Sequence, residues 1–387
     1  MTSDSYPSSQ PLRHQGRAPL RQKRLLRQNR LLHRWIAIVI ALPMLLVILT
    51  GIVLQVRKPI DWVQPPTLTG SSAYEPTVRL EELLTQVKSV PEMQVTGWQD
   101  IKLLDMRPQK GIVKVRNFDE LETQVDVTTG EVLQTAQRRN DFIAKMHDFS
   151  AWRARLWLGL PIRLGFLFMF LTGVYLNVKL TAVRLKGLFR RNPLPPMGRG
   201  ESPSRHGAVD DRGAIASERI APEKKGRPWR LRLKASLMTY HYWLGWVVLI
   251  PWAVVIGSGL LLQVRYELPW VLPAQQQGQG TVPQVEFVQL YETARQQPEY
   301  GVQDWKDVWR IYVYPSDGIS AVRAKNRQEF QIDSETGEIL QTAVRRKDWL
   351  EDIHEGKWHD LNLWLFLPVH ILSLLLWMTG AVVAYTR

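Results

Sequence analysis

Four segments of this chain are long and apolar enough to cross a lipid bilayer, and they constrain its fold more than any other feature. Residues 35–56 and 240–264 each run for more than 20 residues without a formal charge, which is the length that a membrane-spanning helix needs. Residues 361–386 form a similar run that contains His370, and residues 156–178 form a weaker run that contains Arg163. We therefore expect an α-helical membrane protein with four spans.

The two halves of the chain repeat each other. Residues 33–57 match residues 241–265 at an offset of 208, and each segment begins His-x-Trp and ends Leu-Gln-Val-Arg. Residues 129–136 read Thr-Gly-Glu-Val-Leu-Gln-Thr-Ala and recur as residues 336–343, with Ile in place of Val, at an offset of 207. The second offset aligns further positions: His147 with His354, and Thr172-Gly173 with Thr379-Gly380. The repeat predicts an internal duplication in which each half contributes two spans.

The net charge of +14 is concentrated beside the predicted spans. Residues 1–34 hold eight Lys and Arg against one acid, and residues 179–234 hold fifteen against five. A basic excess beside a span marks the cytoplasmic side, so we interpret it as a topology signal, aided by membrane lipid, and not as a nucleic-acid surface. Both halves then enter the membrane from the cytoplasm, which predicts a parallel duplication about an axis along the membrane normal. We expect a bacterial inner-membrane protein with both termini in the cytoplasm.

These signals divide the chain into eight predicted regions. In order they are a basic cytoplasmic tail (1–33), a span (34–56), an outer periplasmic domain (57–146), a span (156–179), a basic cytoplasmic linker (180–234), a span (240–264), a second outer periplasmic domain (266–350) and a span (361–385). The linker is predicted from its Pro-, Gly- and Arg-rich composition.

Each outer domain is predicted to be α+β and antiparallel. A short amphipathic helix, at 78–90 in the first domain and at 287–296 in the second, precedes segments in which apolar and polar residues alternate. Gly130 and Gly337 lie in the repeated Thr-Gly-Glu motif, where a tight hairpin turn requires a positive φ. The predicted fold class is therefore a membrane α-helical bundle of four spans with two small outer domains.

What the chain lacks narrows its chemistry. It has no cysteine, which excludes disulfides, iron–sulfur clusters, thiolate metal sites and the covalent attachment of c-type haem. It has no G-x-G-x-x-G after a strand, no Walker A loop and no H-E-x-x-H. Nothing therefore predicts a site for NAD(P)H, flavin or ATP, so electrons would have to arrive from a lipid quinol or a separate donor protein.

Four histidines at repeated positions are the candidate ligands. In a parallel duplication His33 and His241 lie together at the cytoplasmic edge, whereas His147 and His354 lie together on the outer side. Two imidazoles that meet across a helical bundle are typical of b-type haem iron that transfers electrons. A histidine in the headgroup zone is often only interfacial, but its retention in both halves favours a ligand role. The residues alone leave open which two histidines share an iron.

Several further residues are candidates around such a site. His370 lies inside the fourth span and has no histidine counterpart, because Arg163 occupies the matching position. We expect His370 to be a ligand, a quinol-site proton acceptor or a hydrogen-bond partner of a haem propionate. Arg163 is a candidate to neutralise a propionate, and His359 is a candidate of unassigned role. Aromatic residues of the outer domains are candidates for a docking surface: Trp98, Trp305, Trp309, Tyr312 and Tyr314.

The spans beginning His-x-Trp and ending Leu-Gln-Val-Arg, the Thr-Gly-Glu hairpin and the histidine before the second span resemble the PepSY-associated transmembrane helix proteins. The resemblance covers nearly the whole chain from about residue 30. Its form with four spans and two outer domains is similar to the inner-membrane ferric-siderophore reductases, the ferrioxamine reductases in particular. The resemblance implies PepSY-like outer domains, two non-covalent b-type haems and reduction of Fe(III)-siderophore at the periplasmic face. It carries the family's histidines onto His33, His147, His241 and His354.

The predicted function is therefore an oxidoreductase that passes electrons across the membrane to a ferric siderophore and releases Fe(II) for iron uptake. Two alternatives remain. One is a cytochrome b reductase with another periplasmic acceptor. The other is a haem-free PepSY membrane protein that binds peptides or assists export.

Overall fold

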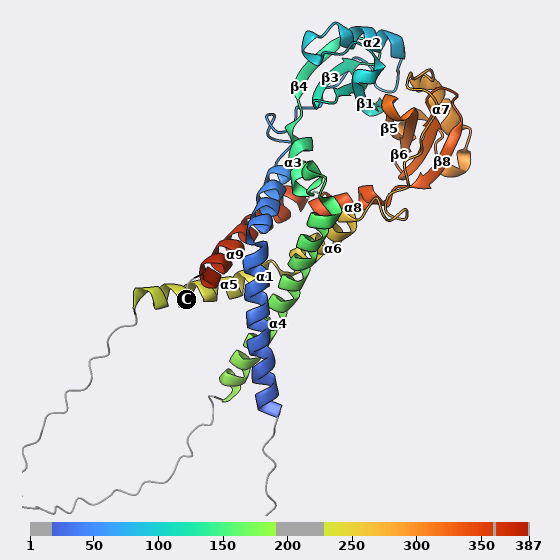
Figure 1. Ribbon diagram of the computed structural model, residues 1–387. Helices are drawn as coiled ribbons and strands as arrows, with labels where there is room; N and C mark the ends of the chain where they lie inside the picture. The colour runs from blue at the N-terminus through green and yellow to red at the C-terminus, as the bar shows by residue number, and fades with distance from the viewer. Residues whose placement is uncertain (1–17, 191–227, 359–360, 386–387) are drawn as a thin grey trace, which may run out of the picture.

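The computed structural model describes residues 18–190, 228–358 and 361–385, and Figure 1 shows a β-sheet domain standing on a set of long helices. Most of the predicted tail, most of the predicted linker and His359 lie outside the described residues. Three helical segments are each long and apolar enough to cross a membrane. They are Gln22–Gln55 within α1 (Ala18–Gln55), Arg155–Lys186, which includes α4 (Leu160–Arg190), and Asn362–Tyr385, which includes α9 (Leu367–Tyr385).

The predicted third span differs from a single straight helix. The structure divides it into α5 (Trp229–Val247) and α6 (Leu249–Gln263), which are bent by 66°. Pro251 lacks a backbone N–H, and its ring crowds the carbonyl of Val247, where α5 ends. The matching Pro43 lies inside the unbroken helix α1, so proline permits this break without imposing it. The chain thus has three candidate spans among its described residues, or four if the bent pair is one span.

The two predicted outer domains are joined in one antiparallel sheet of eight strands, ordered β4-β3-β2-β1-β5-β6-β7-β8. The strands are β1 (Ile101–Arg107), β2 (Ile112–Asn117), β3 (Leu121–Asp126), β4 (Val132–Gln137), β5 (Val308–Tyr314), β6 (Ile319–Ala324), β7 (Gln328–Asp333) and β8 (Ile339–Val344). At the central junction of β1 with β5, Asp105 lies opposite Tyr312, its counterpart in the repeat. The register therefore relates the two halves of the sheet by an approximate two-fold axis.

One face of the sheet carries the apolar core. Helices α2 (Leu80–Lys88) and α7 (Phe287–Arg295) pack there with strand residues from both halves in a single buried cluster. The predicted helices at 78–90 and 287–296 correspond to these two. Gly130 and Gly337 adopt φ of +76° and +78° in the β3–β4 and β7–β8 turns, as the hairpin motif predicted.

The opposite face of the sheet buries charged side chains, because alternate strand residues point away from the apolar core. Lys114 is fully buried and its Nζ lies 2.7 Å from Glu122, whose other oxygen lies 2.9 Å from Arg138. In the second half Ala321 stands where Lys114 would be. There Glu329 is paired with Arg323 and Arg345 instead, at 2.6 and 2.9 Å. The same buried carboxylate is thus neutralised with or without the lysine.

This comparison predicts unequal effects of two substitutions. Glu122→Ala would leave Lys114 and Arg138 buried without their shared partner and cost about 3–5 kcal/mol of stability. Lys114→Ala would cost less, because Arg138 remains on Glu122 and the second half is built with alanine there. Thermal unfolding of the full chain in detergent would measure both. A Lys114→Ala variant less stable than Glu122→Ala would contradict this explanation.

Candidate functional site

The four repeated histidines lie on four helices at two levels of the structure. His33 lies on α1 and His241 on α5, far from the sheet, and we call them the far histidines. His147 ends α3 (Arg139–His147) and His354 lies on α8 (Arg346–Glu355), and we call them the sheet-side histidines. Strand β4 leads directly into α3, and β8 leads directly into α8 (Figure 1). The sheet therefore positions both sheet-side histidines.

Each histidine is held by a hydroxyl group from another helix. The four Nδ1–hydroxyl distances lie between 2.9 and 3.1 Å: His33 with Thr172, His147 with Thr50, His241 with Thr379 and His354 with Ser258. Each hydroxyl also lies within 3.0 Å of the carbonyl oxygen four residues earlier in its own helix. The same two-step contact occurs four times.

These contacts select one tautomer of every ring. A backbone carbonyl can only accept, so each hydroxyl donates its single proton to that carbonyl and accepts a hydrogen bond from the imidazole. The imidazole Nδ1 must therefore carry the proton, which leaves the lone pair of Nε2 free. A neutral imidazole whose other nitrogen is fixed in this way is the form that binds metals in proteins.

A glycine follows each of these hydroxyl residues and lets the imidazole approach the helix. A Cβ atom added at Gly51, Gly173, Gly259 or Gly380 would lie 3.4, 3.3, 3.0 or 2.9 Å from Cε1 of the histidine held there. The sequence predicted that these small residues let a macrocycle or a neighbouring helix approach closely. In the structure the close neighbour of each glycine is the histidine ring.

The sheet-side histidines meet across the two halves. The ring centroids of His147 and His354 are 6.3 Å apart, with an angle of 66° between the ring planes. Bonds from a metal to an imidazole nitrogen are about 2 Å long, so two rings on opposite sides of one metal have centroids roughly 6 Å apart. The observed separation suits two ligands of a single metal. The far histidines, His33 and His241, have equivalent hydroxyl partners, and their pairing stays a prediction.

A cavity of about 230 Å³ surrounds the sheet-side histidines. Its walls are mostly apolar, with Val47, Ile48 and Trp252 among them. Burial, strengthened by the nearby charge of Arg163, lowers the pKa of His354 to about 4 and holds the pKa of His147 well below its ordinary value. Both imidazoles are therefore neutral at physiological pH, which is the state that a metal ligand requires.

Arg163 and His370 both line this cavity. The guanidinium of Arg163 donates to Oε1 of Gln263 at 2.5 Å and to the carbonyl of His147 at 3.2 Å. Nδ1 of His370 donates to the carbonyl of Phe366 at 2.7 Å, so its Nε2 is the nitrogen left for a ligand. Both candidates lie beside the sheet-side histidines, and neither is near the far ones by the contacts that hold them.

The ends of the two Leu-Gln-Val-Arg motifs hold the sheet-side histidines from the opposite half. Gln55 donates to the carbonyl of Glu355 at 2.9 Å, and Gln263 donates to the carbonyl of Asp148 at 3.2 Å. Arg57 pairs with Glu355 at 2.7 Å, and Arg265 pairs with Asp148 at 3.2 Å. Because Asp148 and Glu355 directly follow the histidines, each half fixes the histidine of the other. We call these four contacts the cross-half latches.

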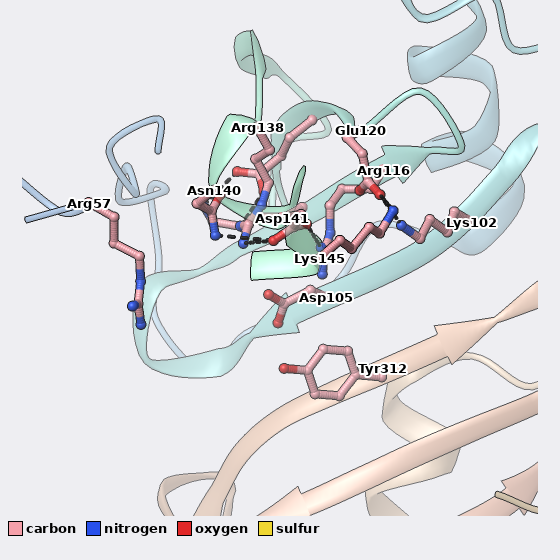
Figure 2. Close-up of polar contacts among 12 residues, drawn as sticks. Arg57, Lys102, Asp105, Arg116, Glu120, Arg138, Asn140, Asp141, Lys145 and Tyr312 are labelled. Carbon is pink, nitrogen blue, oxygen red and sulfur yellow. Dashed lines mark hydrogen bonds and ion pairs between the residues drawn. The ribbon is translucent and has the colours of Figure 1, made fainter. Parts of the chain in front are cut away.

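Ion pairs also tie α3 to the sheet (Figure 2). Asp141, in the first turns of α3, accepts from Arg116 of β2 at 2.8 Å and from Arg138 at 3.1 Å. Burial opposes ionisation, but these arginines hold the pKa of Asp141 below its ordinary value. Lys145, further along α3, donates to Glu120 at 2.7 Å, and Glu120 also binds Lys102. The helix that ends at His147 is thus anchored along its length.

Comparison with known proteins now adds a family. The family model described as the PepSY-associated TM region matches residues 30–387. The chain belongs to this family. No curated protein matches it. Membership in a PepSY-associated transmembrane family, together with the candidate spans, makes this a membrane protein.

Some functional contacts escaped the sequence analysis although their signals were present. Thr50, Ser258, Thr172 and Thr379 were noted only as small residues, yet each keeps a hydroxyl at its repeated position. The Leu-Gln-Val-Arg motif was noted only as a repeat, and its Gln and Arg form the latches. Among the docking candidates, Trp98 and Tyr312 are buried in the sheet domain, Trp305 stacks on Tyr291, and Trp309 is exposed.

The glycine contacts predict a matched pair of outcomes on α6. Gly259→Ala would place a methyl group 3.0 Å from His354 and 3.3 Å from Arg163, and such overpacking costs about 1–3 kcal/mol. Gly257→Ala, two residues away, meets nothing within 4 Å and gains helix propensity, so stability would be unchanged or higher. Unfolding temperatures in one detergent would compare them. Equal losses in both variants would mean that the contact with His354 is unimportant.

The latches predict energetic coupling between the halves. Arg265→Gln and Asp148→Asn would each reduce stability, and together they would cost less than the sum, with a coupling of about 1 kcal/mol. The pair of Arg295 and Glu292 on α7 is a control, because it is exposed and lies within one helix. Its double-mutant cycle would show coupling near zero. Additive effects for the first pair would show that the latch does not join the halves energetically.

Proposed function

We propose that this protein is a di-haem b reductase of the bacterial inner membrane that passes single electrons to a ferric siderophore in the periplasm. In this proposal the helical segments form four spans of a parallel duplication, and two PepSY-like domains share the periplasmic sheet. The contact between His147 and His354 is the observation that carries the proposal: two neutral rings, 6.3 Å apart, each with its Nε2 free. The release of Fe(II) for iron uptake would be its physiological result.

The donor set fits a haem better than a bare metal ion. Among the residues that the structure describes, no group of three or more His, Asp or Glu could hold a metal ion. Two histidines alone leave most positions of an iron unfilled, and a porphyrin supplies four nitrogens of its own. The apolar cavity suits a flat hydrophobic macrocycle, and Arg163, with one guanidinium nitrogen beside Gly259, suits its carboxylates.

The two histidine pairs are separated along the membrane normal in this proposal. On α1, His33 lies 18 residues before Gly51, against which His147 packs. That interval is about 27 Å of helix, which is most of the roughly 30 Å thickness of a bilayer core. A pair near each face would allow electrons from a quinol or a separate donor protein to cross the membrane.

The chain's own residues would hold and tune the redox centres. Thr50 and Ser258 fix the sheet-side rings as Nε2 ligands, and the latches hold the backbone that follows each ring. Bis-histidine haems, when bound, supply one-electron transfer. One electron converts Fe(III) of the siderophore to Fe(II), which the hard oxygen ligands of a siderophore hold more weakly. The siderophore would dock on the sheet domain, where Trp309 is exposed beside Arg310.

The proposal predicts a coloured protein with two haems per chain. Purified in mild detergent, it would show a Soret band whose α and β bands sharpen on reduction with dithionite, and a pyridine haemochrome assay would count the haems. His354→Ala and His241→Ala would each lose one haem and keep the fold, because each removes one ligand of a different pair. Full haem content in either variant would exclude the corresponding pair.

Substrate is tested separately from cofactor. Ferric ferrioxamine would reoxidise the dithionite-reduced protein, whereas the gallium(III) complex, which cannot be reduced, would leave it unchanged. A coloured protein that ignores ferric siderophores would be a cytochrome with another acceptor. A colourless protein that takes up no haem would exclude the redox function and favour a peptide-binding role.

A further inference from the structure

The cavity around the sheet-side histidines is built almost entirely of matched pairs. Of its 22 lining residues, 20 fall into ten pairs related by the repeat offsets of 207 and 208. Six pairs are identical: Val47 and Val255, Ile48 and Ile256, Gly51 and Gly259, Leu54 and Leu262, Gln55 and Gln263, and His147 and His354. Asp148 and Glu355 preserve the charge. The cavity therefore lies on an approximate two-fold axis that exchanges its two histidines.

Three pairs break this symmetry. Arg163 is matched by His370, Phe166 by Ser373, and Ala144 by Glu351. The second difference is partly compensated, because Trp252, where the first half has Met44, fills space beside Ser373 and donates a hydrogen bond to it. The third is neutralised locally, because Glu351 pairs with Lys347 on its own helix at 2.8 Å. The difference between Arg163 and His370 is compensated by no such exchange.

Symmetry decides what such a difference can do. A planar group held between His147 and His354 can be turned by half a revolution about the two-fold axis, which exchanges its faces and its histidines. If the lining were perfectly matched, the two orientations would have equal free energy and equal population. Only the residues that break the match can favour one of them.

We propose that Arg163 and His370 select a single orientation of the haem between His147 and His354. This inference rests on the proposed function and adds to it which residues give the bound cofactor its direction. The b-type macrocycle carries its two carboxylates at one edge, so it is itself polar. The fixed positive charge of Arg163 favours the orientation that brings this anionic edge nearer to it, and His370 offers no equal attraction.

The structure gives Arg163 the rigidity that this role needs. Its Nε is fixed on Gln263 and one terminal nitrogen on the carbonyl of His147, while the other terminal nitrogen lies near Gly259. Gln263 is itself held by the carbonyls of Asp148 and Arg155. The guanidinium is thus locked to the backbone that carries one ligand, and it is nine-tenths buried. A mobile or solvent-exposed charge could not discriminate orientations in this way.

The test is the proton NMR spectrum of the oxidised, haem-loaded full chain, in which each haem orientation gives its own set of shifted methyl signals. The wild type would show one dominant set for the sheet-side haem. Arg163→His and His370→Arg each make the pair symmetric and would show two sets within about threefold of equal population. The combined swap, R163H with H370R, would return one dominant set and reverse the Soret circular dichroism of that haem.

Controls separate this inference from the proposed function. Glu351→Ala makes a different pair of the same cavity symmetric and would leave the single set unchanged, and the signals of the far haem serve as an internal reference. If Arg163→His loses the sheet-side haem, His370→Arg decides, because it keeps Arg163. A colourless wild type would overturn the proposed function. A coloured protein in which His370→Arg keeps one dominant set would overturn this inference alone.

Discussion

The hydrogen bond from each imidazole Nδ1 to a helix hydroxyl is the contact on which the candidate site depends. Without it a buried histidine could adopt either tautomer, and its ring could turn away from its neighbour. The hydroxyl is itself fixed because its proton is committed to a backbone carbonyl. The glycine that follows removes the Cβ that would push the ring away. Three small features of one helix turn thus position and polarise a side chain from another helix.

The sheet and the latches extend this order to the level of the whole molecule. Pairing of β1 with β5 makes one sheet of two halves, and the sheet delivers α3 and α8 to the same place. The latches then hold each helix from the opposite half, at the residue that follows its histidine. The distance between His147 and His354 is therefore set by contacts on both sides of the pair, and neither half could set it alone.

Sequence reasoning reached the repeat, the apolar segments, the hairpin glycines and the set of histidines, because each is encoded in local patterns. It could not reach the junction of β1 with β5, since pairing at a sheet edge depends on residues 200 positions apart. It also missed the break after Val247, because Pro43 occupies the same sequence context in an unbroken helix. The latches were visible as the repeated Gln and Arg, but their partners are non-local carbonyls and carboxylates that no pattern names.

Repetition and divergence have separate consequences in this chain. Repeated residues generate the pairs, because a side chain kept in both halves meets its counterpart wherever the two-fold axis passes, as His147 meets His354. A perfectly repeated site, however, cannot distinguish one side of a bound group from the other. Direction requires a difference, and the cavity concentrates an uncompensated difference of charge at Arg163 and His370 while keeping the ligands identical. A site of this kind can therefore acquire an orientation without any change in the groups that bind.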